Sequence, residues 1–383
     1  MSETLSDVVT IFDGPHATPA RKAEGKYFLN IACLNDGRLD LAAADRVSDD
    51  DFRVWTRRVT PLAGDLLFSY ETRLGEAALM PEGIDACLGR RMALLRPKPG
   101  RVHPRFLLYY FLSPRFQRLI EMNTIHGATV NRIGLASMGQ WPVELPRRET
   151  QQAVAEVLGA LDDKIAVNAN VVAASESLMS TAYSKLAYSG HLVPLSTTAS
   201  FINGKAFTKG ASDTGRLVVR IAEMNSGISN SSVYSDAIVD EEYLARPGSI
   251  LFAWSGSLSV HRWFREEAIV NQHIFNVLPN PGYPNWLVFQ MLQSKMASFR
   301  AIAADKATTM GHIQRHHLEA LVSLPAHEQL ASCDALMAAS WSKALLSERE
   351  SLALVALRDT LLPALMSGKL RVRDAEKAVE EVL

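Results

Sequence analysis

One pattern of acids and a lysine near the N-terminus has the residue types of a metal-dependent nuclease. Asp13 is followed by Glu24-Gly25-Lys26, and paired acids with a lysine can hold a metal ion and orient a water molecule. This triplet is common by chance, and Asp13 stands in an Asp-Gly-Pro sequence that is typical of a turn. We therefore expect no catalytic residue in this chain and keep a catalytic nuclease only as a minor alternative.

Two histidines near the end of the chain have a spacing that can bind zinc. His312 and His316 are four residues apart, which places two ligands on one face of a helix. We favour the alternative, a polar helix end that faces DNA, and expect no metal site. The segment Ser255-Gly256-Ser257 lacks the GxSxG spacing of a nucleophile elbow. The sequence also has no P-loop and no Gly-rich loop for an adenosyl cofactor, so we expect no cofactor on this chain.

Length and composition predict a globular protein of two or three domains. The chain has 383 residues, 48% of them hydrophobic and 21% charged, and a net charge of -1. It contains no uninterrupted run of 18 apolar residues and does not begin like a signal peptide, so we expect a cytoplasmic protein with no membrane partner. Its three cysteines lie far apart, which excludes a disulfide framework and a four-cysteine zinc site.

Residues 87–118 are strongly basic, although the chain as a whole is nearly neutral. They hold eight lysines and arginines and no acid, and such a stretch could contact phosphate groups. The other interpretation is a solvated helix face or a turn, and the sequence leaves both open. A near-neutral chain would need basic partner proteins to bind duplex DNA tightly.

The clearest signal in the sequence is an internal duplication. Four pairs of segments match in the same order, with offsets between 179 and 184 residues: 63–69 with 247–253, 128–133 with 308–313, 145–146 with 324–325, and 185–186 with 369–370. Collinear matches with so little drift predict a repeated unit of about half the chain.

Each copy begins with a mixed segment and continues into a long helix. Short apolar runs predict strands, and apolar segments after a proline predict helices. The predicted strands are 66–69, 217–221 and 250–254, and the predicted helices are 106–112 and 286–292. This pattern indicates a compact α/β domain in each copy.

The long helices carry apolar residues at the 3.5-residue spacing of a coiled coil. The first repeat runs from Val154 to Leu186 with polar exceptions at Asn168 and Ser175, and polar seam residues can fix register. Two such helices predict an antiparallel pair, and the alternative is that each packs on its own domain. The predicted seam residues are Leu158, Leu161, Ile165, Val172 and Met179 in the first helix and Trp341, Leu345, Leu352 and Val355 in the second.

This arrangement resembles the specificity subunits of type I restriction–modification systems. The resemblance rests on the tandem organisation and on short segments in their order along the chain. These segments are Asp13-Gly14-Pro15-His16-Ala17-Thr18-Pro19, Gly64-Asp65-Leu66-Leu67-Phe68-Ser69, Leu161-Asp162-Asp163-Lys164-Ile165 and the end of the second helix, 362–370. The second helix departs from the pattern, because it reads Ser340-Trp341-Ser342-Lys343-Ala344 where the first has its Leu-Asp-Asp-Lys-Ile segment.

The resemblance implies an α+β fold with two α/β-type target recognition domains, at residues 1–145 and 191–325. It places the helices in a central conserved region, 146–190, and a C-terminal region with its tail, 326–383, as an antiparallel coiled coil with pseudo-two-fold symmetry. A helix over 148–186 would span about 58 Å, so we expect the two domains to lie roughly one to two DNA turns apart.

The resemblance also implies a non-catalytic subunit that reads a split, asymmetric target in double-stranded DNA. It implies docking of type I methyltransferase subunits and, through the complex, of restriction or translocase subunits. S-adenosylmethionine, ATP and Mg are expected on those partners. The alternative from another class is a helical scaffold or adaptor that does not read DNA sequence.

Candidate DNA-reading residues are loop residues of the types that recognise base edges in the major groove. In the first domain they are His16, Thr18, Arg21, Lys22, Arg73, Thr129, Asn131 and Arg132, and in the second Lys205, Lys209, Ser255, Ser257, His261, Arg262, Thr309 and His312.

Overall fold

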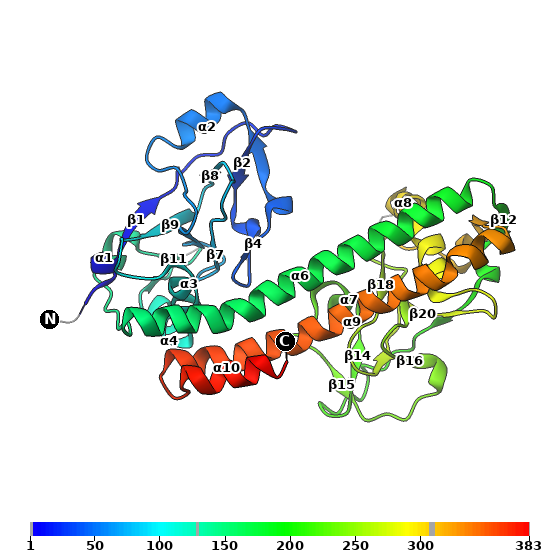
Figure 1. The fold of residues 1–383 in the computed structure, drawn as a ribbon. Helices are drawn as coiled ribbons and strands as arrows, with labels where there is room; N and C mark the ends of the chain where they lie inside the picture. The colour runs from blue at the N-terminus through cyan, green and yellow to red at the C-terminus, as the bar shows by residue number, and fades with distance from the viewer. Residues whose placement is uncertain (1–2, 128–129, 306–310, 383) are drawn as a thin grey trace. The chain divides into compact units, whose positions relative to one another are not determined.

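The computed structural model describes residues 3–127, 130–305 and 311–382 (Figure 1). The fold is α+β and divides into two compact units. Unit 1 contains Met1–Lys164 and Leu354–Leu383, and unit 2 contains Ile165–Ala353. Each unit therefore combines one mixed domain with a segment of each of two long helices, α6 (Arg148–Ala187) and α9 (His327–Met366).

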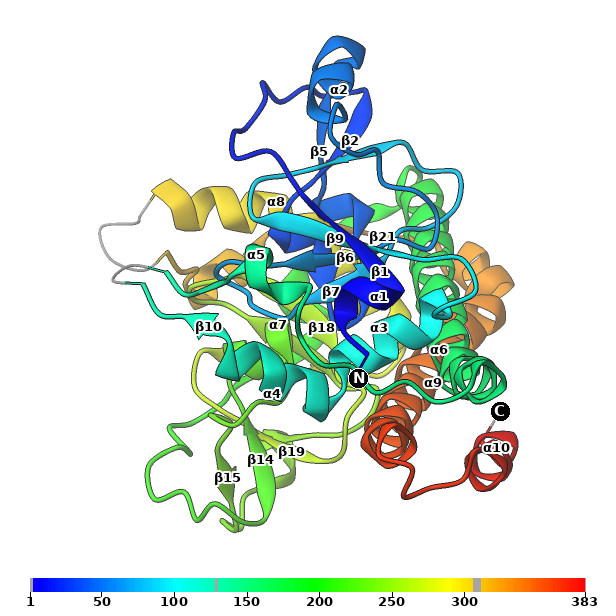
Figure 2. The ribbon, with the colours of Figure 1, turned by 90° about the vertical axis from the view of Figure 1, so that its left-hand side faces the viewer.

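Unit 1 has a four-stranded antiparallel sheet in the order β1-β9-β6-β7 and a three-stranded sheet in the order β5-β2-β8 (Figure 2). In the second sheet β2 and β8 are parallel. The strands are β1 (Val9–Asp13), β2 (Lys26–Leu29), β3 (Leu34–Asn35), β4 (Arg38–Leu39), β5 (Asp45–Val47), β6 (Leu66–Ser69), β7 (Ala77–Leu79), β8 (Ala86–Leu88), β9 (Met92–Pro97), β10 (Thr124–Ile125) and β11 (Arg132–Ile133). The helices are α1 (Leu5–Val8), α2 (Asp49–Trp55), α3 (Pro104–Leu112), α4 (Pro114–Met122), α5 (Leu135–Met138) and α10 (Val372–Glu380).

Unit 2 repeats this topology with a four-stranded sheet in the order β13-β20-β17-β18 and a second sheet in the order β15-β14-β19-β16. Its strands are β12 (His191–Pro194), β13 (Ala199–Asn203), β14 (Arg216–Val219), β15 (Tyr234–Ser235), β16 (Leu244–Ala245), β17 (Ile250–Ala253), β18 (Ser259–Arg262), β19 (Ala268–Val270), β20 (Ile274–Pro279) and β21 (Leu321–Leu324). Its helices are α7 (Ile221–Ser226) and α8 (Asn285–Asp305).

The strand registers confirm the internal duplication. Val9 in β1 lies opposite Pro97, and Ala199 in β13 lies opposite Pro279. The offsets between these pairs are 190 and 182 residues. The parallel strands repeat the same offsets, because β2 and β8 pair as β14 and β19 do. The two domains therefore share one backbone plan.

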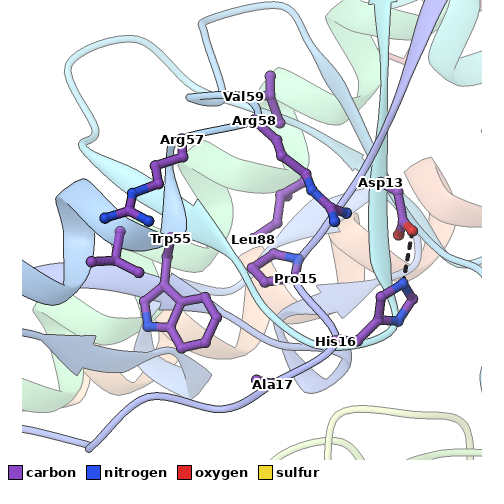
Figure 3. Close-up of a pocket in the computed structure, with 10 residues that line it drawn as sticks. Asp13, Pro15, His16, Ala17, Trp55, Arg57, Arg58, Val59 and Leu88 are labelled. Atoms are coloured by element: carbon purple, nitrogen blue, oxygen red, sulfur yellow. Dashed lines mark ion pairs between the residues drawn. The ribbon is translucent and has the colours of Figure 1, made fainter.

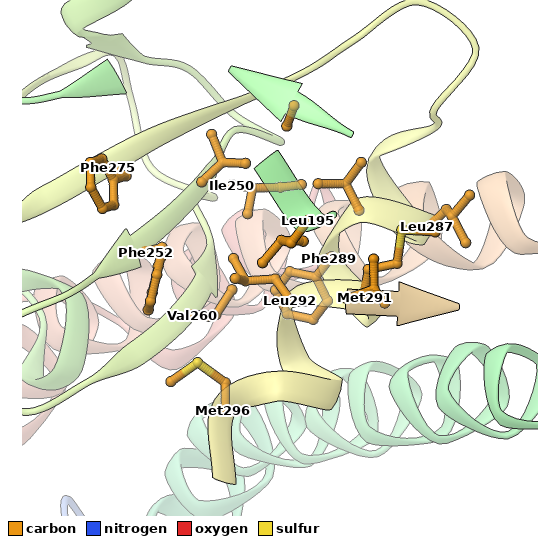
Figure 4. Close-up of a cluster of buried hydrophobic side chains, with 14 of the residues drawn as sticks. Leu195, Ile250, Phe252, Val260, Phe275, Leu287, Phe289, Met291, Leu292 and Met296 are labelled. Carbon is orange, nitrogen blue, oxygen red and sulfur yellow. The ribbon is translucent and has the colours of Figure 1, made fainter. Parts of the chain in front are cut away.

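The core of each domain forms where the apolar faces of its sheet and helices meet. In unit 2 Phe252 and Phe275 belong to one cluster with Leu287 and Leu292 of α8 (Figure 4). Phe299 of α8 is part of the same cluster. Met179 of α6 and Trp341 of α9 belong to the same cluster. The helical segments therefore form part of the domain's core.

Each long helix begins where its Leu-Pro pair predicts. α6 starts two residues after Pro146, and α9 starts two residues after Pro325. Glu149 and Glu328 lie in their first turns, where a negative charge is favourable.

The residues predicted for the seam of α6 lie on a buried face of the helix. Leu158, Leu161, Ile165 and Met179 are all buried, and Val172 is half-buried. Asn168 is buried as well, at 3% exposure. The apolar spacing alone identified the buried face of this helix, since its large side chains face inward.

The predicted seam of α9 is wrong by one position for most of its length. Trp341 is buried, but Leu345, Leu352 and Val355 are only half-buried. The more deeply buried face follows alternating steps of four and three through Ser340, Ala344, Ser347, Ser351, Leu354, Arg358, Leu361 and Leu365. The first four of these residues are small, which permits close approach of the neighbouring backbone. The large apolar residues that guided the prediction flank this face.

Two other predicted elements change in length. The strand predicted for 217–221 ends at Val219, and Ile221 starts α7. The helix predicted for 286–292 extends to Asp305. The predicted strand 66–69 and the start of strand 250–254 agree with β6 and β17.

Candidate nucleic-acid interface

The two domains share a three-segment backbone arrangement at the ends of β6 and β17. In unit 1 the Tyr70 N–H donates to the Arg91 carbonyl at 3.1 Å, and the Ile133 N–H donates to the Tyr70 carbonyl at 2.8 Å. In unit 2 the Trp254 N–H donates to the His273 carbonyl at 3.1 Å, and the Ile313 N–H donates to the Trp254 carbonyl at 3.0 Å. We call this arrangement the strand-end cradle.

The cradle places equivalent side chains of different chemistry at the same sites. The bridge between Glu71 and Arg132 in unit 1 corresponds to the bridge between Ser255 and His312 in unit 2. Arg91 and His273 also correspond, and both have a left-handed backbone, with φ of 70° and 74°. The backbone is duplicated, but the groups that it presents are not.

In unit 1 the cradle holds an arginine in a fixed orientation. The Arg91 Nε lies 3.0 Å from a Glu71 carboxylate oxygen, and a terminal nitrogen of Arg91 donates to the Thr72 hydroxyl at 3.3 Å. Arg91 keeps about a third of its side chain exposed. Burial and the nearby Asp13 raise the pKa of Tyr70, so its hydroxyl stays protonated.

In unit 2 the cradle is aromatic and carries no carboxylate at the position of Glu71. The ring centroid of Trp254 lies 5.2 Å from that of His273 and 6.4 Å from that of His312. The Trp254 indole N–H donates to Asn203 at 2.8 Å. This hydrogen bond fixes the indole beside two imidazoles, and aromatic rings of this kind suit stacking on a planar group.

A pocket of about 390 Å³ lies beside β1 and the end of α2 in unit 1 (Figure 3). His16 pairs with Asp13 at 3.0 Å on one wall, and Trp55 lies on another. The indole nitrogen of Trp55 is buried and has no hydrogen-bond partner in the described part of the chain. Arg57 and Arg58 also line the pocket, so it combines apolar walls with positive charge.

The predicted DNA-reading residues of unit 1 are mostly exposed. Thr18, Lys22, Asn131 and Arg132 are exposed. Arg21 pairs with Asp45 at 3.2 Å. His16 is exposed in its pair with Asp13, and Arg73 pairs with Glu76 at 3.3 Å. Thr129 lies outside the described residues, as does Thr309 of the second domain.

The predicted residues of unit 2 divide into exposed and buried groups. Lys209 and Ser257 are exposed, and the exposed Lys205 lies over the Tyr243 ring at 4.3 Å. His312 lies in the cradle, and the half-buried His261 contacts Asn225 at 3.0 Å. Burial lowers the pKa of His261.

Two residues of the predicted set for unit 2 are buried. Arg262 is 4% exposed and binds carboxylates of α6 and α9, so it faces the helices and is wrong as a DNA-reading candidate. Ser255 is also buried, at 8% exposure. Both stand where a surface loop was expected, but Arg262 ends β18 and turns inward.

The basic stretch 87–118 is largely neutralised within unit 1. Five of its arginines form ion pairs, and the Lys98 ammonium donates to the Ser6 carbonyl. The pairs are Arg91 with Glu71, Arg96 with Asp65, Arg101 with Glu3, Arg105 with Asp163 and Arg115 with Glu144. Most basic residues of this stretch therefore have a structural role within unit 1, and the interpretation as a phosphate-binding stretch is the weaker one.

The side chains of the nuclease-like triplet have other partners. Asp13 pairs with His16, and Lys26 pairs with Asp85 at 2.6 Å. His312 and His316 do not share an α-helix, because His312 lies in the cradle and His316 in a short 3-10 turn, Arg315–Glu319. The prediction that these histidines lie at the end of one polar helix is therefore wrong. Among the described residues, no group of three or more His, Cys, Asp or Glu side chains could hold a metal ion.

The set of DNA-reading residues predicted from the sequence omits several residues that the fold brings to these sites, although Arg91 lies in the basic stretch 87–118. They are Trp55, Arg57 and Arg58 in the pocket, and Glu71, Thr72, Arg91, Trp254 and His273 in the cradles. The signal available was the alignment of the repeats, since Gly89-Arg90-Arg91 and Asn271-Gln272-His273 occupy the same turn at an offset of 182.

The sequence pattern described as "Type I restriction modification DNA specificity domain" matches residues 4–174. The match covers 171 of the 383 residues. The resemblance to type I specificity subunits is thereby confirmed. The matched residues comprise the mixed domain of unit 1 and the first 27 residues of α6, from Arg148 to Ala174.

A curated relative agrees with this assignment over part of the chain. The "Putative type I restriction enzyme MjaX specificity subunit" of Methanocaldococcus jannaschii is 24% identical over 172 residues. The match covers 42% of this chain and 39% of the relative's length.

One solved structure agrees with the fold of this chain. A type I restriction–modification S subunit from M. genitalium matches with a TM-score of 0.59 and 15% identity, over 95% of each chain. At this identity the match shows the fold alone. An HsdS subunit from Thermoanaerobacter tengcongensis covers 97% of each chain at 16% identity, but its TM-score of 0.33 carries no argument. Among the described residues, no helix is long and apolar enough to span a membrane.

Proposed function

We propose that this chain is the DNA-recognition subunit of a type I restriction–modification complex and reads a split, asymmetric target. The observation that carries the proposal is the duplicated recognition domain, in which one backbone plan presents different side chains in its two copies. Two copies that differ at the same sites suit two short sequences that differ.

The long helices suit the role of a spacer between two half-sites. α6 is continuous over 40 residues, about 60 Å at about 1.5 Å per residue. Adding residues to such a helix changes both the distance and the rotation between whatever its ends carry. We therefore propose that the helices, and not the domains, set the length of the unread gap.

We further propose that the helices dock methyltransferase subunits, and that restriction or translocase subunits join through that complex. Large apolar side chains on both helices remain exposed in unit 2: Val167 and Leu178 on α6, Leu336 and Leu346 on α9. Exposed apolar groups of this size suit a protein partner. Leu336→Glu with Leu346→Glu should weaken co-purification with the methyltransferase, while Leu345→Ala should not.

The chain is proposed to be non-catalytic, with S-adenosylmethionine, ATP and Mg bound by its partners. The purified chain should then show no methyl transfer, DNA cleavage or ATP hydrolysis when these are supplied. Because its net charge is -1, the isolated chain should bind duplex DNA weakly, and the complex should bind with a strong salt dependence.

The decisive experiment is an exchange of the first domain in cells that carry the whole system. Replacing residues 3–145 by the corresponding domain of another specificity subunit should change one half of the methylated motif and leave the other half unchanged. A four-residue insertion in α6 should change the gap and neither half. A swap that alters both halves would contradict modular reading, and a complex that methylates no defined motif would favour a scaffold without sequence reading.

A further inference from the structure

The turn before β9 and the equivalent turn before β20 each contain a residue with an unfavourable backbone conformation. Arg91 and His273 both have positive φ, at 70° and 74°, a region that glycine occupies freely and that a residue with a Cβ rarely adopts. The same position in both copies carries a large nitrogen-bearing side chain instead of glycine. A strained residue kept at equivalent sites points to a use for its side chain.

Unit 1 contains a second strained residue in contact with the first. Thr72 has φ of 69°, which is a genuine outlier for a β-branched residue. Its counterpart at an offset of 184 is Gly256, with φ of 66°. Unit 2 thus uses glycine where the backbone requires it, while unit 1 uses a threonine whose hydroxyl accepts a hydrogen bond from Arg91.

Glu71 forms an ion pair with the Arg91 guanidinium, and Thr72 accepts a hydrogen bond from it. The carboxylate lies 3.0 Å from Nε, and the Thr72 hydroxyl lies 3.3 Å from a terminal nitrogen. These contacts leave donor capacity on a planar fork whose side chain is 32% exposed. A fork held in this way is suited to the two acceptors, O6 and N7, that guanine presents in the major groove.

This inference rests on the proposed function. We propose that Arg91 recognises a guanine in the half-site of unit 1 and that His273 is the equivalent specificity-determining residue of unit 2. His273 is exposed beside the Trp254 ring, with Ser255 where unit 1 has Glu71. The imidazole offers one donor and one acceptor in its neutral form, so it does not select guanine as a bidentate fork does. The two half-sites therefore differ at the base pair that faces this turn.

The test uses the whole complex and compares methylation of plasmids that carry each base at every target position. Arg91→Gly should lower discrimination for guanine at one position of one half-site by about 5- to 150-fold and leave the other half intact. His273→Gly should act only on the other half. Glycine suits the left-handed backbone, so both variants should melt at or above the wild-type temperature.

Further variants separate base reading from structural effects. Thr72→Gly should relieve strain and weaken the guanine preference less than Arg91→Gly does. Arg91→Lys keeps the charge without the fork and should also lose guanine preference, which keeps the test valid if a glycine variant fails to fold. Arg115→Gln, which breaks another arginine–glutamate pair of unit 1, should leave the motif unchanged.

The results distinguish this inference from the proposed function. A uniform loss of methylation on all sequences after Arg91→Gly would indicate a phosphate contact and overturn base reading. An unchanged motif after Arg91→Gly, or a change in the same half after His273→Gly, would also overturn it. If exchanging the whole first domain changes no half-site, the proposed function itself fails.

Discussion

The two units attach their helices through a buried arginine, but they supply it from opposite sides. In unit 1 Arg358 of α9 binds Asp36 of the domain at 2.8 Å and Asp162 of α6 at 3.1 Å. In unit 2 Arg262 of the domain binds Glu348 of α9 at 2.8 Å and Glu176 of α6 at 3.3 Å. The guanidinium of Arg262 also lies over the Trp341 ring at 4.7 Å.

The sheet register explains why the arginine belongs to the domain in unit 2 and to the helix in unit 1. Arg262 lies opposite Ile250 in unit 2, and the corresponding pair in unit 1 is Leu79 with Leu66. Unit 1 has no cation at this position of its sheet, so the helix supplies one. The duplicated backbone therefore keeps the place of the domain–helix contact but not the residue that makes it.

Removal of Arg262 should have the largest effect on stability. Arg262→Ala leaves Glu348, 17% exposed, without its partner, and breaking a buried pair costs about 3–5 kcal/mol. Chemical denaturation of the full chain measures this change. Arg349→Ala on the same helix, which removes an exposed pair with Glu266 at 3.4 Å, should cost less than about 1 kcal/mol. Equal losses of unfolding free energy for the two variants would show that the buried pair of Arg262 contributes no more than the exposed pair of Arg349.

The corresponding change in unit 1 should cost less. Arg358→Ala frees Asp36 and Asp359, whose side chains are 70% and 57% exposed and can be hydrated. We expect a loss of about 2 kcal/mol, mainly from Asp162, by the same denaturation measurement. A loss larger than that of Arg262→Ala would show that the helix-borne arginine is the stronger attachment.

A change at the small-residue seam of α9 should come next. Ala344 is fully buried and Leu345 is half-buried, so Ala344→Leu should cost about 1–2 kcal/mol by overpacking. Leu345→Ala should cost less, although the apolar pattern of the sequence gives Leu345 the greater importance. Thermal melting of the two variants measures which change destabilises the chain more. The opposite order would favour the seam that the sequence predicts.

The smallest expected effect is the pH dependence that His261 adds in unit 2. Burial lowers the pKa of His261 in β18, and the register places Ala78 at its position in unit 1. The unfolded chain takes up a proton that the folded histidine resists, so His261 makes stability fall as the pH drops below its ordinary value of about 6.5. His261→Gln should reduce the loss of unfolding free energy between pH 7.5 and 5.5. Ala78→Ser in unit 1 should leave that pH dependence unchanged.

The sequence by itself determined the features that depend on local order. The duplication, the starts of both helices after Leu-Pro and the buried face of α6 follow from the spacing of residue types along the chain. Helical periodicity identifies a buried face when large apolar side chains lie on it, as Leu158 and Leu161 do. The strand β6 was likewise readable from its run of apolar residues.

The tertiary structure alone decided which residues meet. Part of the buried face of α9 is made of small and polar residues such as Ser347 and Arg358, which carry no apolar signal. Arg262 was expected on a DNA-facing loop but is buried, because carboxylates on two distant helices neutralise it. Glu71, Arg91 and Arg132 come together through hydrogen bonds across three separate segments. Contacts of this kind depend on packing between elements, and no spacing along one element encodes them.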